Sequence, residues 1–171
     1  MIRVLLVEKN HDFRQGIVRQ LEAMPQFKIL EVSNETDLEN ILSVVPVNVA
    51  LVGISTATKY YDMKILEQIH LMKPELPVIV MVPEKHTSLS IEAMRCGASD
   101  DIFVPFDVTE LVDKINRIIG KKKRKKARWR EKLEKAMIGI TFAEAGFDGY
   151  AKDILTEKDS SGKNGSPTPG K

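Results

Sequence analysis

The chain has 171 residues, of which 43% are hydrophobic and 29% are charged, a composition typical of a globular protein with one domain of about 120 residues and an appendage. No apolar run reaches the roughly 18 residues that a membrane-spanning helix needs, so we expect no transmembrane segment. The only cysteine, Cys96, excludes an internal disulfide and fits a reducing cytosol, so we expect a cytoplasmic protein.

The net charge of +2 conceals a division along the chain. Residues 1–120 carry a net charge of −5. The next ten residues, KKKRKKARWR (121–130, here the basic segment), hold eight basic side chains and no acidic one. The sequence therefore predicts an acidic domain joined to a basic stalk.

Three continuous apolar runs predict strands that are buried on both faces of a parallel sheet, at residues 2–7, 47–52 and 78–82. Weaker patterns predict two more strands at 27–32 and 102–104. The first run, IRVLLV, is interpreted as a strand and not as a signal peptide, because no small-residue cleavage site follows it.

Apolar residues at helical spacing follow each predicted strand. They lie in residues 13–24, 38–45, 63–70, 89–94 and 108–119. Asp12 is predicted to cap the first of these helices. Strand and helix alternate five times, which predicts an α/β fold with a doubly wound parallel sheet and right-handed crossovers.

Gly120 is predicted to end the fifth helix, and a new helical pattern begins at Arg124. The apolar side of this second pattern contains Trp129, Leu133, Ala136, Met137, Ile140 and Ala143. A short helix is expected after Gly146, followed by a polar, disordered end. The predicted parts are thus a domain (1–119), a basic amphipathic helical extension (120–158) and a disordered tail (159–171).

Four segments occur in the order and at nearly the spacing of a known domain. They are MIRVLLVEKNHDFRQGI, VNVALVGIS, LPVIVMVP and RCGASDDIFVPFDVTEL. Through them, residues 1–119 resemble the receiver domain of bacterial two-component response regulators. The resemblance implies a flavodoxin-like (βα)5 sheet with strand order 2-1-3-4-5. It also implies a protein partner: a histidine kinase, another receiver or a regulatory complex.

The receiver family transfers a phosphoryl group, and each step requires a residue type. An aspartate after strand three is the nucleophile, two acids after strand one bind Mg²⁺, and a hydroxyl and a lysine stabilise the product. By resemblance, the nucleophile position holds Gly53, and the two acid positions hold Glu8 and Lys9. The hydroxyl position holds Val82 and the lysine position holds Val104. Only Glu8 keeps the required type, so we expect a degenerate receiver with no bound cofactor or metal and no enzymatic activity.

Further predictions concern the surroundings of this pocket. Glu8 and Lys9 are expected to form a charge pair where the ion would sit. Asp62, the nearest acid after strand three, is predicted to lie too far away to replace the nucleophile. The position of the family's switch aromatic falls at Asp101, predicted to precede strand five, and the resemblance implies a cis Val104–Pro105 bond.

The favoured function is that of a pseudo-receiver that acts by phosphorylation-independent protein–protein interaction in a phosphorelay. One alternative is a receiver phosphorylated at an unconventional residue, and another is a regulator that binds nucleic acid through the basic segment. Candidate contacts for a partner or a nucleic acid are Lys121, Lys122, Lys123, Arg124, Lys125, Lys126, Arg128, Trp129 and Arg130. The other options for this helix are an anionic membrane surface, an acidic protein, a homodimer formed through the apolar side that contains Trp129 and Leu133, and a solvated helix whose Trp129 packs against the following helix.

Overall fold

The computed structural model describes residues 1–32 and 35–144. Within these residues, five parallel strands form one sheet in the order β2-β1-β3-β4-β5. The strands are β1 (Ile2–Val7), β2 (Phe27–Glu31), β3 (Val49–Gly53), β4 (Val78–Pro83) and β5 (Asp100–Val104). The predicted fold class and strand order are confirmed.

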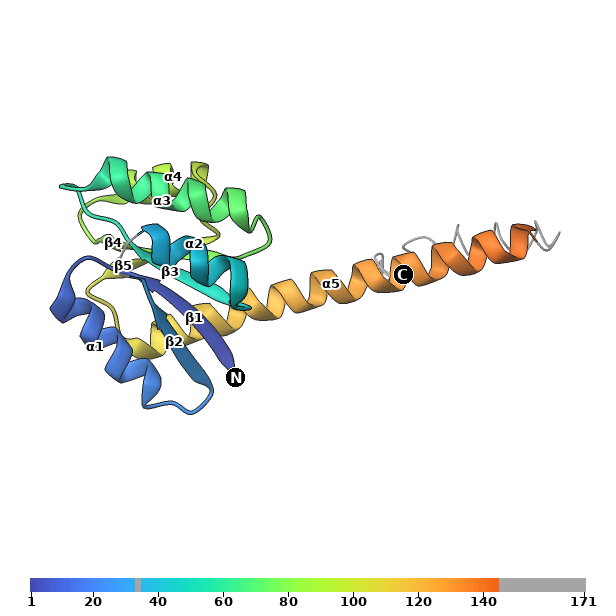
Figure 1. Cartoon of the computed structure of the whole chain (residues 1–171), viewed down its shortest axis with the longest axis horizontal. Helices are drawn as coiled ribbons and strands as arrows, with labels where there is room; N and C mark the ends of the chain where they lie inside the picture. Colours follow the sequence, from blue (N-terminus) through green and yellow to red (C-terminus); the bar gives the residue numbers. More distant parts are fainter. Residues whose placement is uncertain (33–34, 145–171) are drawn as a thin grey trace, which may run out of the picture. The chain divides into compact units, whose positions relative to one another are not determined.

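Helices cover both faces of the sheet, as Figure 1 shows. They are α1 (His11–Glu22), α2 (Glu35–Val44), α3 (Lys59–Met72), α4 (Thr87–Arg95) and α5 (Val108–Glu144). In β1, Leu5 and Val7 belong to the core shared with α2, α3 and α4, while Val4 and Leu6 belong to the core shared with α1 and the first turns of α5. This double burial explains why the strand sequences are continuously apolar.

The strand register brings the predicted pocket positions to one edge of the sheet. Val7 is paired with Val52, and Gly53 is paired with Met81, so the carboxyl ends of β1, β3 and β4 coincide. At the end of β5, Val104 is paired with Pro83 of β4. In open α/β sheets, this carboxyl edge is where ligand sites form.

Several element boundaries in the first 119 residues differ from the predictions by a few residues; the third strand, for example, is Val49–Gly53 and not 47–52. β5 begins at Asp100, two residues before the predicted Ile102, so Asp101 lies inside the strand and not before it. The first helix is capped by Asn10 and not by Asp12, because the side-chain oxygen of Asn10 accepts the Phe13 N–H at 3.0 Å. The Val104–Pro105 bond is cis, as the resemblance implied.

The predicted helix break at Gly120 is wrong, because α5 continues through this residue to Glu144. A single glycine costs a helix about 1 kcal/mol, and here it is followed by lysine, arginine and alanine, which are strong helix formers. The chain divides into two compact units, Met1–Lys121 and Lys122–Lys171. The helix predicted after Gly146 and the tail 159–171 lie outside the described residues. No helix in the described ranges combines the length and apolar character that crossing a bilayer requires.

Candidate functional site

The carboxylate of Glu8 lies directly beside Gly53 at the end of β3. A Cβ atom added to Gly53 would be 1.9 Å from Glu8 Oε2 and 2.8 Å from Glu8 Cδ. The other carboxylate oxygen, Oε1, accepts a hydrogen bond from the Asn10 N–H at 2.7 Å. Glu8 therefore fills the space in which a larger residue at position 53 would begin its side chain.

Lys9 pairs with Asp62 and not with Glu8, so the predicted Glu8–Lys9 pair is wrong. Lys9 Nζ lies 2.8 Å from Asp62 Oδ1, and the side chain of Asp62 is only 4% exposed. Nζ also lies 3.9 Å from the centroid of the Tyr61 ring, a cation–π contact. The ammonium group at the second metal-ligand position is thus bound to a buried carboxylate.

Asp62 lies in the first turn of α3, as predicted, and its carboxylate reaches the loop that follows β3. Its carboxylate accepts hydrogen bonds from the Ser55 N–H at 3.1 Å and from Thr58 Oγ1 at 2.7 Å, in addition to the bond from Lys9. The loop 54–58 is short and α3 starts at Lys59, so the first turn of α3 returns toward the carboxyl edge of the sheet. Three donors therefore satisfy this buried carboxylate.

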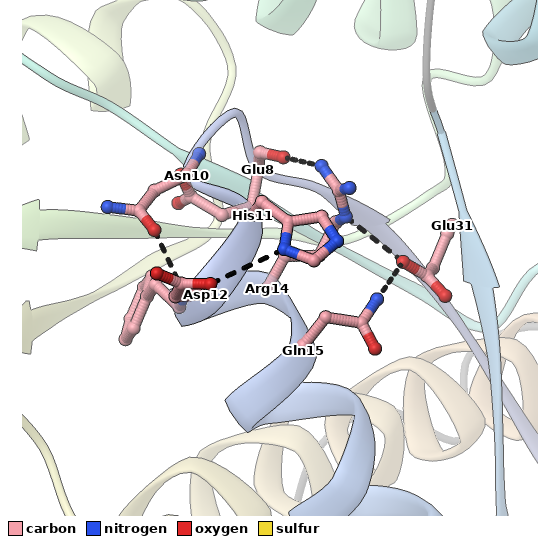
Figure 2. Close-up of polar contacts among 8 residues, drawn as sticks. Glu8, Asn10, His11, Asp12, Arg14, Gln15 and Glu31 are labelled. Carbon is pink, nitrogen blue, oxygen red and sulfur yellow. Dashed lines mark hydrogen bonds and ion pairs between the residues drawn. The ribbon is translucent and has the colours of Figure 1, made fainter.

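Burial raises the pKa of Glu8 above its ordinary value of 4.5. The neighbouring charge of Asp62 acts in the same direction, while hydrogen bonds from the backbone N–H groups of Asn10 and Lys9 and the charge of Arg14 partly offset the rise. Arg14 also fixes the loop, because Nη1 donates to the Glu8 carbonyl at 2.8 Å and Nε lies 3.0 Å from Glu31 Oε2 (Figure 2).

The remaining two pocket positions hold apolar side chains. Val82 is fully buried in the core shared with α2, α3 and α4. Val104 is partly buried and packs against the core on the other face of the sheet. Neither side chain has the hydroxyl or the ammonium that would stabilise a phosphoryl group.

The magnesium ion that the receiver fold implies does not fit these residues. Mg²⁺ prefers oxygen ligands in an octahedral arrangement. Glu8 offers one carboxylate, which is already hydrogen-bonded, Lys9 brings a positive charge, and Asp62 already accepts from three donors. Among residues 1–32 and 35–144, no three His, Cys, Asp or Glu side chains are grouped as a metal site requires.

A hydrogen bond between side chains also joins α4 to β5. Asp101, at the position expected for the switch aromatic, accepts a hydrogen bond from the hydroxyl of Ser90 in α4. The neighbouring Asp100 lies 2.6 Å from Arg117 Nη2 and 3.4 Å from Lys114 Nζ in α5. The first two residues of β5 therefore bind both flanking helices.

The nine candidate contact residues lie on a different part of the chain, in the continuation of α5. All but Lys122 are exposed, and Lys122 is half-buried. Trp129 and the following Leu133 are 60% and 58% exposed. In the part of the chain that the structure describes, none of the eight cations of the basic segment takes part in an ion pair.

A sequence model of the response regulator receiver domain matches residues 4–116. The chain belongs to the response regulator receiver family. In Pseudomonas aeruginosa, the C4-dicarboxylate transport transcriptional regulatory protein DctD is 27% identical to this receiver over 122 residues, which cover 68% of this chain and 25% of DctD. The DNA-binding transcriptional regulator NtrC of Rhizobium meliloti is 33% identical over 73 residues, which cover 43% of this chain and 15% of NtrC. The receiver thus spans a quarter or less of these relatives.

Solved structures show the same fold. The CheY-like receiver domain protein of Methanospirillum hungatei superposes with a TM-score of 0.63 at 17% identity, covering 73% of this chain and 98% of that one. NtrX of Brucella abortus gives a TM-score of 0.66 at 22% identity, covering 80% of this chain and 30% of NtrX. At these identities the likeness concerns the fold alone.

Proposed function

We propose that this receiver acts without phosphoryl transfer, through protein–protein interaction in two-component signalling. The observation that carries the proposal is the position of the Glu8 carboxylate, 1.9 Å from where a Cβ of residue 53 would lie. A phosphoryl-accepting receiver needs this space for its nucleophile and for the incoming group. Here an internal anion fills it, and the Lys9 ammonium is paired with Asp62.

The proposed partner is a histidine kinase, another receiver or a regulatory complex of the same cytoplasmic pathway. The matched relatives are named as transcriptional regulators, which supports a role in a regulatory pathway. A receiver whose pocket is filled by its own side chains presents the same surface to such a partner whether or not a phosphoryl donor is present. We therefore propose that its binding is independent of phosphorylation.

Asp62 is one candidate acceptor for the alternative of unconventional phosphorylation, since its carboxylate accepts a hydrogen bond from the Ser55 N–H in the loop after β3. Its carboxylate is 4% exposed and accepts hydrogen bonds from three donors. A nucleophile must approach its phosphoryl donor directly. The enclosed position of Asp62 therefore favours a structural role and not an acceptor role.

Intact-mass measurement after incubation with acetyl phosphate and Mg²⁺ tests the absence of phosphoryl transfer. We expect no mass increase in the wild-type chain. An increase of one phosphoryl group would contradict the proposal. If that increase disappeared in Asp62→Asn but persisted in Asp12→Asn, the alternative of phosphorylation at Asp62 would be established.

Isothermal titration with the phosphotransfer domain of the cognate histidine kinase tests the interaction itself. We expect binding with the same dissociation constant before and after treatment with acetyl phosphate. A dissociation constant that changes more than about threefold on treatment would contradict a phosphorylation-independent interaction.

A further inference from the structure

We infer that the basic segment of α5 binds nucleic acid through the phosphate backbone, a function beyond that of the receiver. Eight cations occur in ten residues of one continuous helix, with no acid between them. Seven of these cations are exposed, and in the described part of the chain all eight are without an ion-pair partner. Such a density of unpaired cations stabilises binding to a polyanion by releasing condensed counterions.

The cations surround the helix instead of forming one stripe. Successive residues of an α-helix differ in direction by about 100°, so Lys121, Lys122, Lys123 and Arg124 face four different sides. A flat anionic surface contacts only one side of such a helix. The major groove of a DNA duplex admits an α-helix and places phosphates on both of its flanks. This distribution therefore favours a nucleic acid over a membrane or one face of an acidic protein.

The apolar residues that follow the basic segment also disfavour a lipid surface. Lys122 and Lys126 precede Trp129 and Leu133 by seven residues each, and residues seven apart share one face of a helix. A bilayer that accepted Trp129 and Leu133 would therefore have to accept two ammonium groups on the same face. The side chains of Trp129 and Leu133 are both exposed and therefore accessible to a partner. The indole of Trp129 can stack on a base.

The composition of the helix lacks the side chains that usually read adenine. Residues 121–138, KKKRKKARWREKLEKAMI, contain no asparagine, glutamine, serine or threonine. Asparagine and glutamine are the usual readers of adenine, and phosphate contacts carry no sequence information. Arginine and lysine can also read guanine, so the inference of a nucleic-acid ligand rests on charge and groove shape and not on a defined operator sequence.

Fluorescence anisotropy of a labelled mixed-sequence DNA duplex, titrated with the full chain at several salt concentrations, tests the inference. We expect log K to fall linearly with log salt, with a slope between about −4 and −6. The variant Lys121→Gln, Lys123→Gln, Lys125→Gln should bind at least about tenfold more weakly at 0.1 M salt, with a slope shallower by about two to three. Glutamine is a good helix former, so the helix is expected to persist, which circular dichroism checks.

The matched control neutralises three exposed lysines of the receiver instead, in the variant Lys28→Gln, Lys73→Gln, Lys85→Gln. It has the same net charge as the test variant, and its affinity for the duplex should stay within about twofold of wild type. Trp129 is the only tryptophan, so a change in its emission on adding DNA reports contact at the helix itself.

Three results would overturn the inference. They are no binding at low salt, an equal loss of affinity in the control variant, and no response of the Trp129 emission to bound duplex. Two further titrations separate other partners, with polyglutamate for an acidic protein and with phosphatidylserine vesicles for a membrane. If either bound as tightly as the duplex at the same salt concentration, nucleic acid would not be the preferred ligand.

Discussion

The carboxylate beside Gly53 comes from the loop after β1 and not from β3. In the family the carboxylate belongs to the end of β3, whereas here Glu8 supplies it from the loop after β1. The Asn10 N–H donates a hydrogen bond to the Glu8 carboxylate and holds it in place. Glu8 therefore cannot act as the nucleophile that the family carries at position 53. The smallness of Gly53 is thus what allows Glu8 its position.

The proximity of Glu8 and Gly53 predicts an energetic coupling between them. In the wild type, Gly53→Ala forces the Glu8 carboxylate away from the Asn10 N–H and breaks that hydrogen bond. In a Glu8→Ala background the same substitution meets empty space. We expect Gly53→Ala to be less favourable in the wild type than in Glu8→Ala by about 1 kcal/mol, measured by urea unfolding of the four chains. Additive effects of the two substitutions would contradict the contact.

The raised pKa of Glu8 predicts a dependence of stability on pH. The native state binds this proton more tightly than the unfolded state, so the free energy of unfolding falls as pH rises from 4.5 through the raised pKa. Glu8→Gln keeps an acceptor for the Asn10 N–H and carries no charge. We expect Glu8→Gln to be more stable than wild type above this window, and the difference to shrink as pH falls below it.

Urea unfolding between pH 3 and pH 8 checks this expectation. Glu22→Gln is the matched control, because Glu22 is exposed in the last turn of α1. As a surface substitution, it should change the free energy of unfolding by no more than about 0.5 kcal/mol. A constant difference between Glu8→Gln and wild type across the whole range would contradict the burial of a charged Glu8.

In the pair of Lys9 and Asp62 only Asp62 is buried, so we expect its substitution to lower the free energy of unfolding more than substitution of Lys9. Asp62→Ala leaves the Ser55 N–H and the Thr58 hydroxyl without their acceptor, so we expect a loss of about 2 to 4 kcal/mol in the free energy of unfolding. Lys9→Met leaves two donors on Asp62 and should cost about 1 to 2 kcal/mol. Asp12→Ala, at an exposed aspartate, should cost less than about 0.5 kcal/mol in the same urea experiment. Equal costs at Asp12 and Asp62 would contradict the network.

The identities of the pocket residues were predictable from sequence, whereas their partners were not. The resemblance to the receiver family located Glu8, Gly53, Val82 and Val104, because the four segments that carry it follow one another at nearly the family's spacing. The Lys9–Asp62 pair joins residues 53 apart in the chain, and it depends on how the loop 54–58 turns. The one local signal for the hydrogen bonds of Asp62 was its spacing from two hydroxyl residues. Thr58 precedes Asp62 by four residues, and Ser55 precedes Thr58 by three.

At the scale of elements, α5 serves both units of the chain without interruption. Its first turns bury Leu111, Ile115, Ile118 and Ile119 against the sheet, and Asp100 of β5 binds Lys114 and Arg117. Although partial burial raises the pKa of Asp100, the hydrogen bonds from Arg117 and the Asp101 N–H and the charges of Lys114 and Arg117 lower it overall. The start of α5 is thus anchored by apolar and charged contacts together.

The continuity of α5 through Gly120 predicts that alanine is better at this position. A Cβ added to Gly120 meets nothing within 4 Å. Gly120→Ala should therefore raise the free energy of unfolding by about 0.5 to 1 kcal/mol and increase the helical signal in circular dichroism. Gly16→Ala in α1 is a matched control with equal open space and should have a similar effect. A destabilised Gly120→Ala would indicate a helix break at this residue.

The start of β5 was missed because side chains distant in the sequence set it. β5 includes Asp100 and Asp101 because Arg117, Lys114 and Ser90 provide their partners. Local pattern alone places acidic residues outside a buried strand. Similarly, Gly120 looked like a helix end because glycine is the usual residue after one, and the helix-forming residues that follow it decided otherwise.

At the scale of the whole molecule, the chain combines an acidic receiver with a basic helix. The alternation of strands and helices predicted the receiver correctly, since both faces of each strand had to be covered. The separation of acidic and basic residues along the chain led to the prediction that the basic segment binds a partner separately from the receiver. What sequence alone did not supply is the content of the pocket, where Glu8 replaces a missing side chain.

Titration of the ¹⁵N-labelled full chain with Mg²⁺ and beryllofluoride, followed by amide NMR, tests the central claim that internal side chains fill the pocket. We predict that the amide signals of Glu8, Gly53 and Ser55 stay within the small shifts that the same Mg²⁺ concentration causes elsewhere on the surface. Saturable shifts of these signals, with a stoichiometry of one beryllofluoride, would show that the pocket accepts a phosphoryl group and would contradict the claim.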